Sequence, residues 1–143
     1  MSTFNWGILG PGGIARAFAT DLQTLAGHSV AAVGSRTLSN AQEFVSTFGG
    51  TAYGSYEELV ADESVDAIYV ATPHPAHKEN VIAALYAGKP VLCEKPFAVN
   101  TQEAQEMVAA AVANNVALME AMWSRFLPHY ALVREIVASG ILG

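Results

Sequence analysis

The most informative segment for the fold of this chain is Asn5-Trp6-Gly7-Ile8-Leu9-Gly10-Pro11-Gly12-Gly13-Ile14-Ala15. The apolar run 6–9 predicts a strand, the glycine cluster after it predicts a tight turn, and the amphipathic run 14–25 predicts a helix. The turn reads Gly10-x-Gly12-x-x-Ala15, which has the spacing of a dinucleotide-binding fingerprint with alanine in the third position.

Each small residue of this turn has a physical role. Gly10 lets the chain turn sharply off the strand, Gly12 lets a pyrophosphate approach the backbone, and Ala15 keeps the helix close to the strand. The positive end of the helix and its free N–H groups would then face the phosphates. Glycine-rich turns also occur as plain strand–helix connections, so the motif alone leaves that alternative open.

The composition is that of a globular domain with a sizeable core. The 143 residues are 52% hydrophobic and 14% charged, with seven Lys and Arg, thirteen Asp and Glu, and a net charge of −6. This length corresponds to roughly one domain. The lack of a basic run argues against nucleic acid and anionic membranes as main partners. The low charge indicates apolar surface that another domain or subunit would cover.

Cys93 is the only cysteine, which excludes an intramolecular disulfide and any zinc site built from several cysteines. It is most simply a buried strand residue, since no general base is evident that would make it a nucleophile. We find neither a signal peptide nor an apolar stretch long enough to span a bilayer. A cytoplasmic protein is therefore expected.

Strands and helices alternate along the chain. Capping boxes at Ser39-x-x-Gln42, Ser55-x-x-Glu58 and Asn100-x-x-Glu103 indicate helix starts, as do Pro75 and Pro128. The predicted strands are 6–9, 29–34, 51–53, 66–71, 90–93 and 116–119, and the predicted helices are 14–25, 39–48, 55–60, 75–87, 100–115 and 128–138. Because these strands are continuous apolar runs, they predict a parallel sheet covered on both faces, a doubly wound α/β fold of the Rossmann type.

In such sheets ligands bind outside the carboxyl ends of the strands. The segments that follow the predicted strands are Gly10 to Gly13, Ser35-Arg36, Thr72-Pro73-His74, Glu94-Lys95-Pro96 and Trp123 to Arg125. We therefore expect the functional residues to come from these segments and to lie at one edge of the sheet.

Ser35 and Arg36 bear on the choice of cofactor. A site that prefers NAD usually carries Asp or Glu after the second strand, where this chain has a hydroxyl and a guanidinium. These two groups suit the 2′-phosphate of NADP(H), and the guanidinium plane can also stack on adenine. We predict NADP(H) as the preferred cofactor and NAD(H) as the alternative. The competing interpretation is a solvated arginine at a strand end.

Lys95 is the candidate catalytic residue. It follows an apolar strand beside Glu94, and Pro96 restricts its backbone to extended conformations. In this position it could donate a hydrogen bond to a reacting oxygen or transfer a proton. The alternative is a lysine that pairs with Glu94 or another carboxylate for structural reasons. None of the tyrosines forms a Tyr-x-x-x-Lys arrangement with a lysine.

Two further pairs of residues lie at the same edge. His74 and His77 have a spacing that permits a metal site, but no acidic or cysteine ligand accompanies them, so we expect no metal. A role beside the cofactor or at the helix start fits them better. Trp123 and Arg125 could frame a nicotinamide or a substrate group, and the alternative for Trp123 is packing against a neighbour.

Several motifs in this order resemble one family, the Gfo/Idh/MocA oxidoreductases, which includes glucose–fructose oxidoreductase and inositol dehydrogenase. The motifs are Gly10-Pro11-Gly12-Gly13-Ile14-Ala15, Ser35-Arg36, Ala71-Thr72-Pro73 with His77 after it, Cys93-Glu94-Lys95-Pro96, and the segment from Glu120 to Pro128. The Glu-Lys-Pro and Trp-x-Arg-Phe-x-Pro pair looks most like the branch that contains dimeric dihydrodiol dehydrogenase and NADP-dependent D-xylose 1-dehydrogenase.

The resemblance implies a role for each matching position. Contacts to the pyrophosphate would come from Gly10, Gly12, Gly13 and Ile14, contacts to the adenosine ribose phosphate from Ser35 and Arg36, and the lining of the cleft from Thr72, Pro73 and His77. Contacts to the nicotinamide ribose would come from Glu94 and Lys95, with Lys95 also near the reacting hydroxyl, and contacts to the nicotinamide from Trp123 and Arg125.

The resemblance also implies a reaction and a domain organisation. The reaction would be hydride transfer between nicotinamide and a carbon that bears a sugar, polyol or diol hydroxyl. Members of the family carry a second α+β domain that supplies the substrate pocket and most of the dimer interface. We therefore expect residues 1–143 to be a dinucleotide-binding domain, truncated before that second domain, from a homo-oligomeric protein. A non-catalytic dinucleotide-binding sensor and a flavodoxin-like domain without a nucleotide site are the alternatives.

Overall fold

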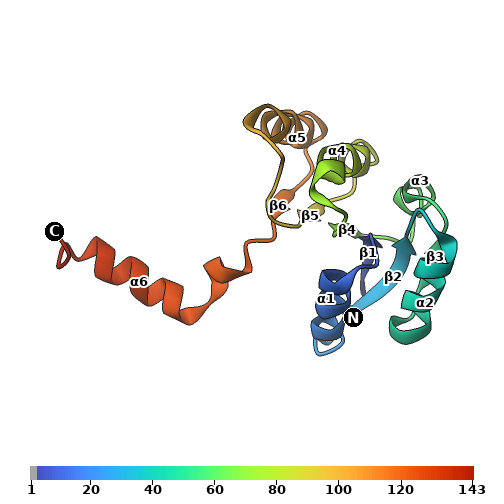
Figure 1. The fold of residues 1–143 in the computed structure, drawn as a ribbon, viewed down its shortest axis with the longest axis horizontal. Coiled ribbons are helices and arrows are strands. Elements are labelled where there is room, and N and C mark those ends of the chain that lie inside the picture. The colour runs from blue at the N-terminus through green and yellow to red at the C-terminus, as the bar shows by residue number, and fades with distance from the viewer. Residues whose placement is uncertain (1–2) are drawn as a thin grey trace.

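A single six-stranded parallel sheet forms the centre of the molecule (Figure 1). The computed structural model describes residues 3–143. In sequence order the strands are β1 (Phe4–Leu9), β2 (His28–Gly34), β3 (Thr51–Tyr53), β4 (Ala67–Val70), β5 (Val91–Cys93) and β6 (Leu118–Glu120). Their spatial order is β3-β2-β1-β4-β5-β6, the order of a dinucleotide-binding Rossmann fold, which confirms the predicted fold class.

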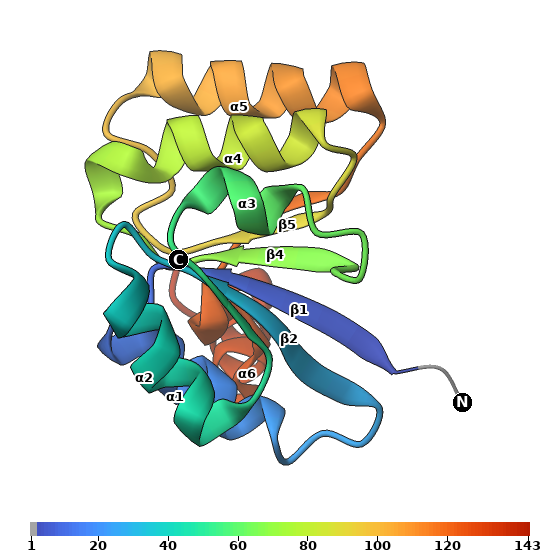
Figure 2. The same cartoon turned by 90° about the vertical axis from the view of Figure 1, so that its right-hand side faces the viewer.

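Helices cover both faces of this sheet (Figure 2). One face carries α1 (Gly13–Leu22) and α2 (Leu38–Phe48), and the other carries α3 (Tyr56–Val60), α4 (His77–Tyr86) and α5 (Thr101–Asn114). Successive strand side chains point to opposite faces, so Ile8 and Tyr69 belong to the core under α1 and α2, whereas Leu9 and Val70 belong to the core under α3 to α5. The strands are therefore apolar on both sides.

The register of the parallel strands brings their carboxyl ends to one edge. Leu9 pairs with Gly34 and with Val70, and Val70 pairs with Cys93, which in turn pairs with Glu120. The segments that leave these strands consequently start side by side, as the sequence predicts.

Two of the three predicted capping boxes form. Ser55 Oγ accepts the Glu58 N–H at 3.2 Å, and Asn100 Oδ1 accepts the Glu103 N–H at 2.9 Å. The box predicted at Ser39 is wrong, because α2 begins earlier, at Leu38, with Thr37 as its N-cap residue. Ser35 Oγ accepts the Thr37 N–H and thereby turns the chain into the helix before Ser39 is reached.

Other element boundaries differ from prediction by a few residues. The first helix ends at Leu22 rather than at residue 25, because the Thr24 hydroxyl and N–H both bond the Asp21 carbonyl and close the last turn. A 3₁₀ turn, η1 (His74–Ala76), precedes α4, so Pro75 lies before that helix rather than in its first turn. The sixth strand is displaced by two residues toward the C-terminus at its start and by one at its end, at 118–120 instead of 116–119.

The segment after β6 leaves the sheet. It forms a 3₁₀ turn, η2 (Trp123–Phe126), and then α6 (Pro128–Ala138), which projects away from the rest of the chain (Figure 1). None of the α6 residues is buried, and Leu132, Val133 and Val137 are each more than half exposed. None of the helices in residues 3–143 is long and apolar enough to cross a membrane.

The turn after β1 requires glycine at position 10. Gly10 has φ +88°, and a Cβ there would lie 3.0 Å from the Ala71 carbonyl oxygen. We expect Gly10→Ala to lower the free energy of unfolding by about 2–3 kcal/mol through backbone strain and this close approach. Urea unfolding would measure the change. A loss below about 0.5 kcal/mol, the size of a neutral surface substitution, would contradict this account of the turn.

Candidate functional site

The glycine turn forms one wall of a pocket at the carboxyl edge of the sheet. The pocket has a volume of about 450 Å³. Its lining residues are Gly10, Pro11, Gly12, Gly13, Ile14, Ser35, Arg36, Thr37, Asn40, Tyr56, Ala71, Thr72 and Pro73. Eight residues that the sequence predicts as cofactor contacts are therefore brought together: Gly10, Gly12, Gly13, Ile14, Ser35, Arg36, Thr72 and Pro73.

Beside the glycine turn, the pocket has room for a ligand group that packs directly against the backbone. Apart from the adjoining residues and the backbone of α1 itself, a Cβ added at Gly12 or Gly13 would meet no protein atom within 4 Å, so packing against other parts of the chain does not explain glycine at these positions. Gly12 is the N-cap residue of α1, and its N–H donates to the Gly10 carbonyl at 2.8 Å. From Gly13 onward, the N–H groups of the first turn have no partner within the helix. An anion such as a pyrophosphate matches this combination of open space and unpaired donors.

Arg36 is the cation of the pocket. Its side chain is exposed, and within residues 3–143 it forms neither a salt bridge nor a side-chain hydrogen bond. Ser35 differs, since it is only 5% exposed and its hydroxyl already accepts the Thr37 N–H at 3.2 Å. The Ser35 hydroxyl therefore shapes the loop, and Arg36 is the residue whose donors are free.

A second pocket of about 420 Å³ continues along the same edge toward β6. Its lining residues are Ile14, Ala17, Phe18, Asp21, Tyr69, Leu92, Glu94, Met119, Ala121, Met122, Trp123 and Phe126. Ile14 lines both pockets and so connects them. Trp123 lies on η2 and is 65% exposed, and Arg125 lies on the same turn but outside both pockets.

Glu94 and Lys95 leave the end of β5. Glu94 Oε1 accepts the Tyr69 hydroxyl at 2.6 Å, and its Oε2 accepts the Lys95 N–H at 3.1 Å. The Lys95 ammonium forms no salt bridge with any residue in 3–143, so the structural pairing with Glu94 that the sequence left open does not form. The exposed Lys95 side chain is consequently free for a ligand.

His77 lies behind the pockets rather than in them. Its side chain is fully buried, and its ring nitrogens lie 2.9 Å from the Thr72 carbonyl oxygen and 3.1 Å from the Pro96 carbonyl oxygen. Asn80 supports the same loop by donating to Thr72 Oγ1 at 3.3 Å. His77 therefore connects the loop after β4 to the loop after β5 and presents no surface to a cofactor.

The remaining candidates are Cys93 as a nucleophile and the histidine pair His74 and His77 as metal ligands, and the structure supports neither role. Burial raises the pKa of the Cys93 thiol to about 12, which removes it as a nucleophile at neutral pH. The His74 and His77 rings are 5.5 Å apart, and no group of three or more potential metal ligands occurs in residues 3–143.

Sequence reasoning missed several residues at this edge. Thr37, Asn40 and Tyr56 line the glycine pocket. Tyr56 could have been found, because it follows the carboxyl end of β3 in the same way that Arg36 follows β2. Tyr69 could not, because it lies inside an apolar strand and only the tertiary contact with Glu94 reveals its hydroxyl.

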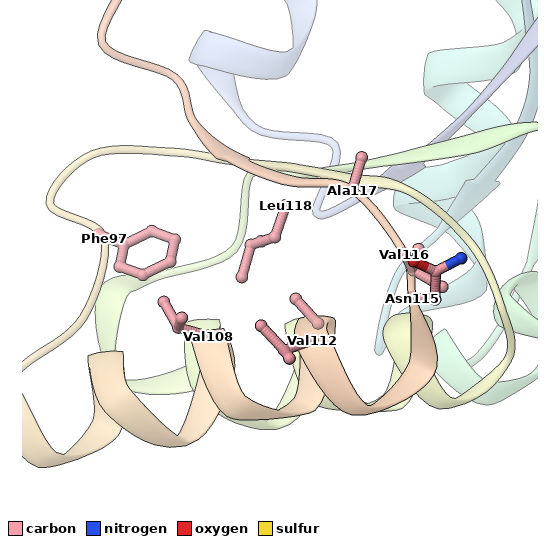
Figure 3. A pocket seen from close by; sticks show the side chains of 8 residues that line it. Phe97, Val108, Val112, Asn115, Val116, Ala117 and Leu118 are labelled. Carbon is pink, nitrogen blue, oxygen red and sulfur yellow. The ribbon is translucent and has the colours of Figure 1, made fainter.

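A groove of about 530 Å³ lies elsewhere, between α5 and the start of β6 (Figure 3). Val108 and Val112 of α5 face Phe97 and Leu118 across it. Asn115 is the only lining residue with a polar side chain, so the groove lacks the cation and the glycine backbone of the first pocket. The candidate site is therefore the edge that carries Gly12, Arg36 and Glu94.

Comparison with known proteins agrees with this geometry. The family described as "Oxidoreductase family, NAD-binding Rossmann fold", Gfo/Idh/MocA, matches residues 4–122. This chain belongs to the Gfo/Idh/MocA oxidoreductase family. The resemblance inferred from the motifs is thereby confirmed, and the chain carries the nicotinamide dinucleotide-binding domain of an oxidoreductase.

Relatives of this chain include dehydrogenases that are named for a diol and for a sugar. The trans-1,2-dihydrobenzene-1,2-diol dehydrogenases of Mus musculus and Homo sapiens are 50% and 49% identical to this chain, over 96% of it and 42% of each relative. The D-xylose 1-dehydrogenase (NADP(+)) of Hypocrea jecorina is 44% identical, over 99% of this chain and 39% of that enzyme. These relatives confirm the branch that the motifs indicated.

A solved structure is also similar to this chain. A 3-ketoreductase from Actinomadura kijaniata in complex with NADP has a TM-score of 0.91 and 31% identity, over 99% of this chain and 46% of that one. This chain thus spans less than half the length of the relatives it matches.

Proposed function

We propose that this domain binds NADP(H) in preference to NAD(H). The observation that carries the proposal is the pocket in which the open backbone at Gly12 and Gly13 lies with the unpaired guanidinium of Arg36. The glycine turn and the N-terminus of α1 would hold the pyrophosphate, and Arg36 would hold the 2′-phosphate, with Ser35 shaping the loop. The NADP-dependent xylose dehydrogenase and the NADP-bound ketoreductase support this preference.

The nicotinamide half would lie along the second pocket. Ile14 connects the two pockets, and Glu94 and Trp123 line the second one, which supports contacts from these two side chains to the nicotinamide and its ribose. Lys95 follows Glu94 in the chain and Arg125 lies on the same turn as Trp123, so we assign both to the nicotinamide end although neither lines the pocket. His77 supports the cleft from behind by connecting the Thr72 and Pro96 loops.

We further propose that the full-length protein is a dehydrogenase or reductase of a sugar, polyol or diol. When bound, the nicotinamide supplies or accepts the hydride. In the reduction of a carbonyl, the Lys95 ammonium would donate a hydrogen bond and then a proton to the oxygen of the carbonyl that receives the hydride. In the reverse reaction, the neutral Lys95 amine would accept the proton of the hydroxyl whose carbon gives up the hydride. We assign this role to Lys95 because it follows Glu94 at this edge and forms no salt bridge within residues 3–143. The low charge content and the exposed apolar side chains of α6 support a homo-oligomer.

Titration of the protein with NADPH and NADH, followed by fluorescence, tests the cofactor. We expect tighter binding of NADPH, and we expect Arg36→Ala to raise the Kd for NADPH about tenfold or more while leaving that for NADH within about twofold, because only NADPH carries the 2′-phosphate.

Arg134→Ala is the matched control, since it removes an exposed arginine of α6 that lies outside both pockets. Equal losses for the two cofactors, or tighter binding of NADH by the unaltered protein, would refute the assignment of Arg36.

A further inference from the structure

Tyr69 places a buried hydroxyl at the edge of the second pocket. It lies in the central strand β4 and is 2% exposed. Its hydroxyl donates to Glu94 Oε1 at 2.6 Å, and its ring stacks on Phe18 of α1 with centroids 4.1 Å apart and an interplanar angle of 24°. The neighbouring residue in register on β5 is Leu92, two positions before Glu94 and therefore on the same face of the sheet.

This contact is short and charge-assisted. An O–H group that donates to a carboxylate at this distance forms one of the stronger hydrogen bonds in proteins. Burial, and next the bond to Glu94, raise the pKa of the Tyr69 hydroxyl, so it stays protonated and remains a donor at neutral pH. The second Glu94 oxygen accepts the Lys95 N–H, so both carboxylate oxygens are engaged within the chain.

We propose that Tyr69 is a positioning residue for the nicotinamide half of the cofactor, acting through Glu94. The Tyr69 hydroxyl fixes the Glu94 carboxylate and with it the backbone of Lys95, before any ligand arrives. The stack on Phe18 ties this arrangement to α1, the helix that begins at the glycine turn. The two halves of the site are thereby held in one geometry. This inference rests on the proposed binding of NADP(H).

Tyr69→Phe tests it, because this variant keeps the ring and its stack on Phe18 and removes only the hydroxyl. We expect the Kd for NADPH to rise about fivefold, in keeping with the loss of one hydrogen bond to a charged group. The Kd for 2′,5′-ADP, which has the adenosine half and no nicotinamide, should stay within about 1.5-fold, since Tyr69 does not line the glycine pocket. Isothermal titration calorimetry measures both.

Tyr53→Phe is the matched control. Tyr53 also donates its hydroxyl to a carboxylate, Asp62 Oδ2 at 3.1 Å, but it lines neither pocket. The Tyr53→Phe variant should change neither Kd. Both Tyr53→Phe and Tyr69→Phe remove one hydrogen bond to a carboxylate, so both can lower the melting temperature. A general loss of stability would weaken both ligands together and would refute the positioning role.

A double-mutant cycle with Glu94→Ala locates the effect. If Tyr69 acts through Glu94, Glu94→Ala alone weakens NADPH and spares 2′,5′-ADP, and adding Tyr69→Phe changes neither Kd further. Additive effects of the two substitutions would overturn the inference, as would unchanged NADPH affinity in Tyr69→Phe. Failure of the unaltered protein to bind NADPH would instead overturn the proposed function on which the inference rests.

Discussion

Lys95→Met is expected to lower kcat of the full-length protein by about 100-fold or more, the range that a proton-transferring group contributes. Methionine keeps the unbranched apolar stem of lysine but removes the charge and all three donors. Since the Lys95 ammonium pairs with no residue in 3–143, its loss breaks no salt bridge in that range. The Kd for NADPH should stay within about threefold, so the loss lies in turnover rather than in cofactor binding.

Lys78→Met is the control for this experiment. Lys78 lies on α4, pairs with Glu106 at 3.2 Å and lines neither pocket, so its replacement should leave turnover unchanged. Assays on a panel of aldoses and diols would measure kcat for both variants. Undiminished turnover in Lys95→Met would end the catalytic assignment. A full-length protein that binds NADPH without turning over any of these substrates would favour the sensor alternative.

Gly12→Val is expected to raise the Kd for NADPH by about 100-fold or more while the domain still folds. The valine side chain would occupy the open space against which we place the pyrophosphate, and close backbone approach is the reason for glycine at this position of the fingerprint. Gly12 has φ −84°, a value that other residues adopt, and a Cβ there meets no protein atom within 4 Å. We therefore expect the Gly12→Val variant to fold.

Circular dichroism and the melting temperature check the fold of Gly12→Val, and calorimetry checks its affinity. Gly10→Ala provides the contrast, because the strain at position 10 is expected to cost stability first. The two glycines of the turn thus differ in role: Gly10 is required for folding, and Gly12 is required for binding. Retained affinity in Gly12→Val would mean that the pyrophosphate does not approach the backbone here.

The fold could be predicted almost completely, because its determinants are local. Continuous apolar strands alternate with helices that carry their own start signals, such as Asn100 with Glu103, and this alternation allows few topologies. The errors were confined to element ends. At Ser39 a capping box appeared in the sequence, but the hydroxyl of Ser35 turns the chain earlier, and a contact of this kind competes with the box in a way that residue spacing does not reveal.

The candidate site was predictable in part: the segments that form it could be predicted, but the orientations of several of its side chains could not. Chain order was enough to show which segments meet, since the carboxyl ends of parallel strands share one edge, and it thereby indicated Gly12, Arg36 and Glu94. The directions of the side chains, in contrast, follow from tertiary packing. His77 is buried between two loops, and Tyr69 reaches from inside a strand to the Glu94 carboxylate. Such orientations depend on contacts between residues distant in sequence, which chain order alone does not specify.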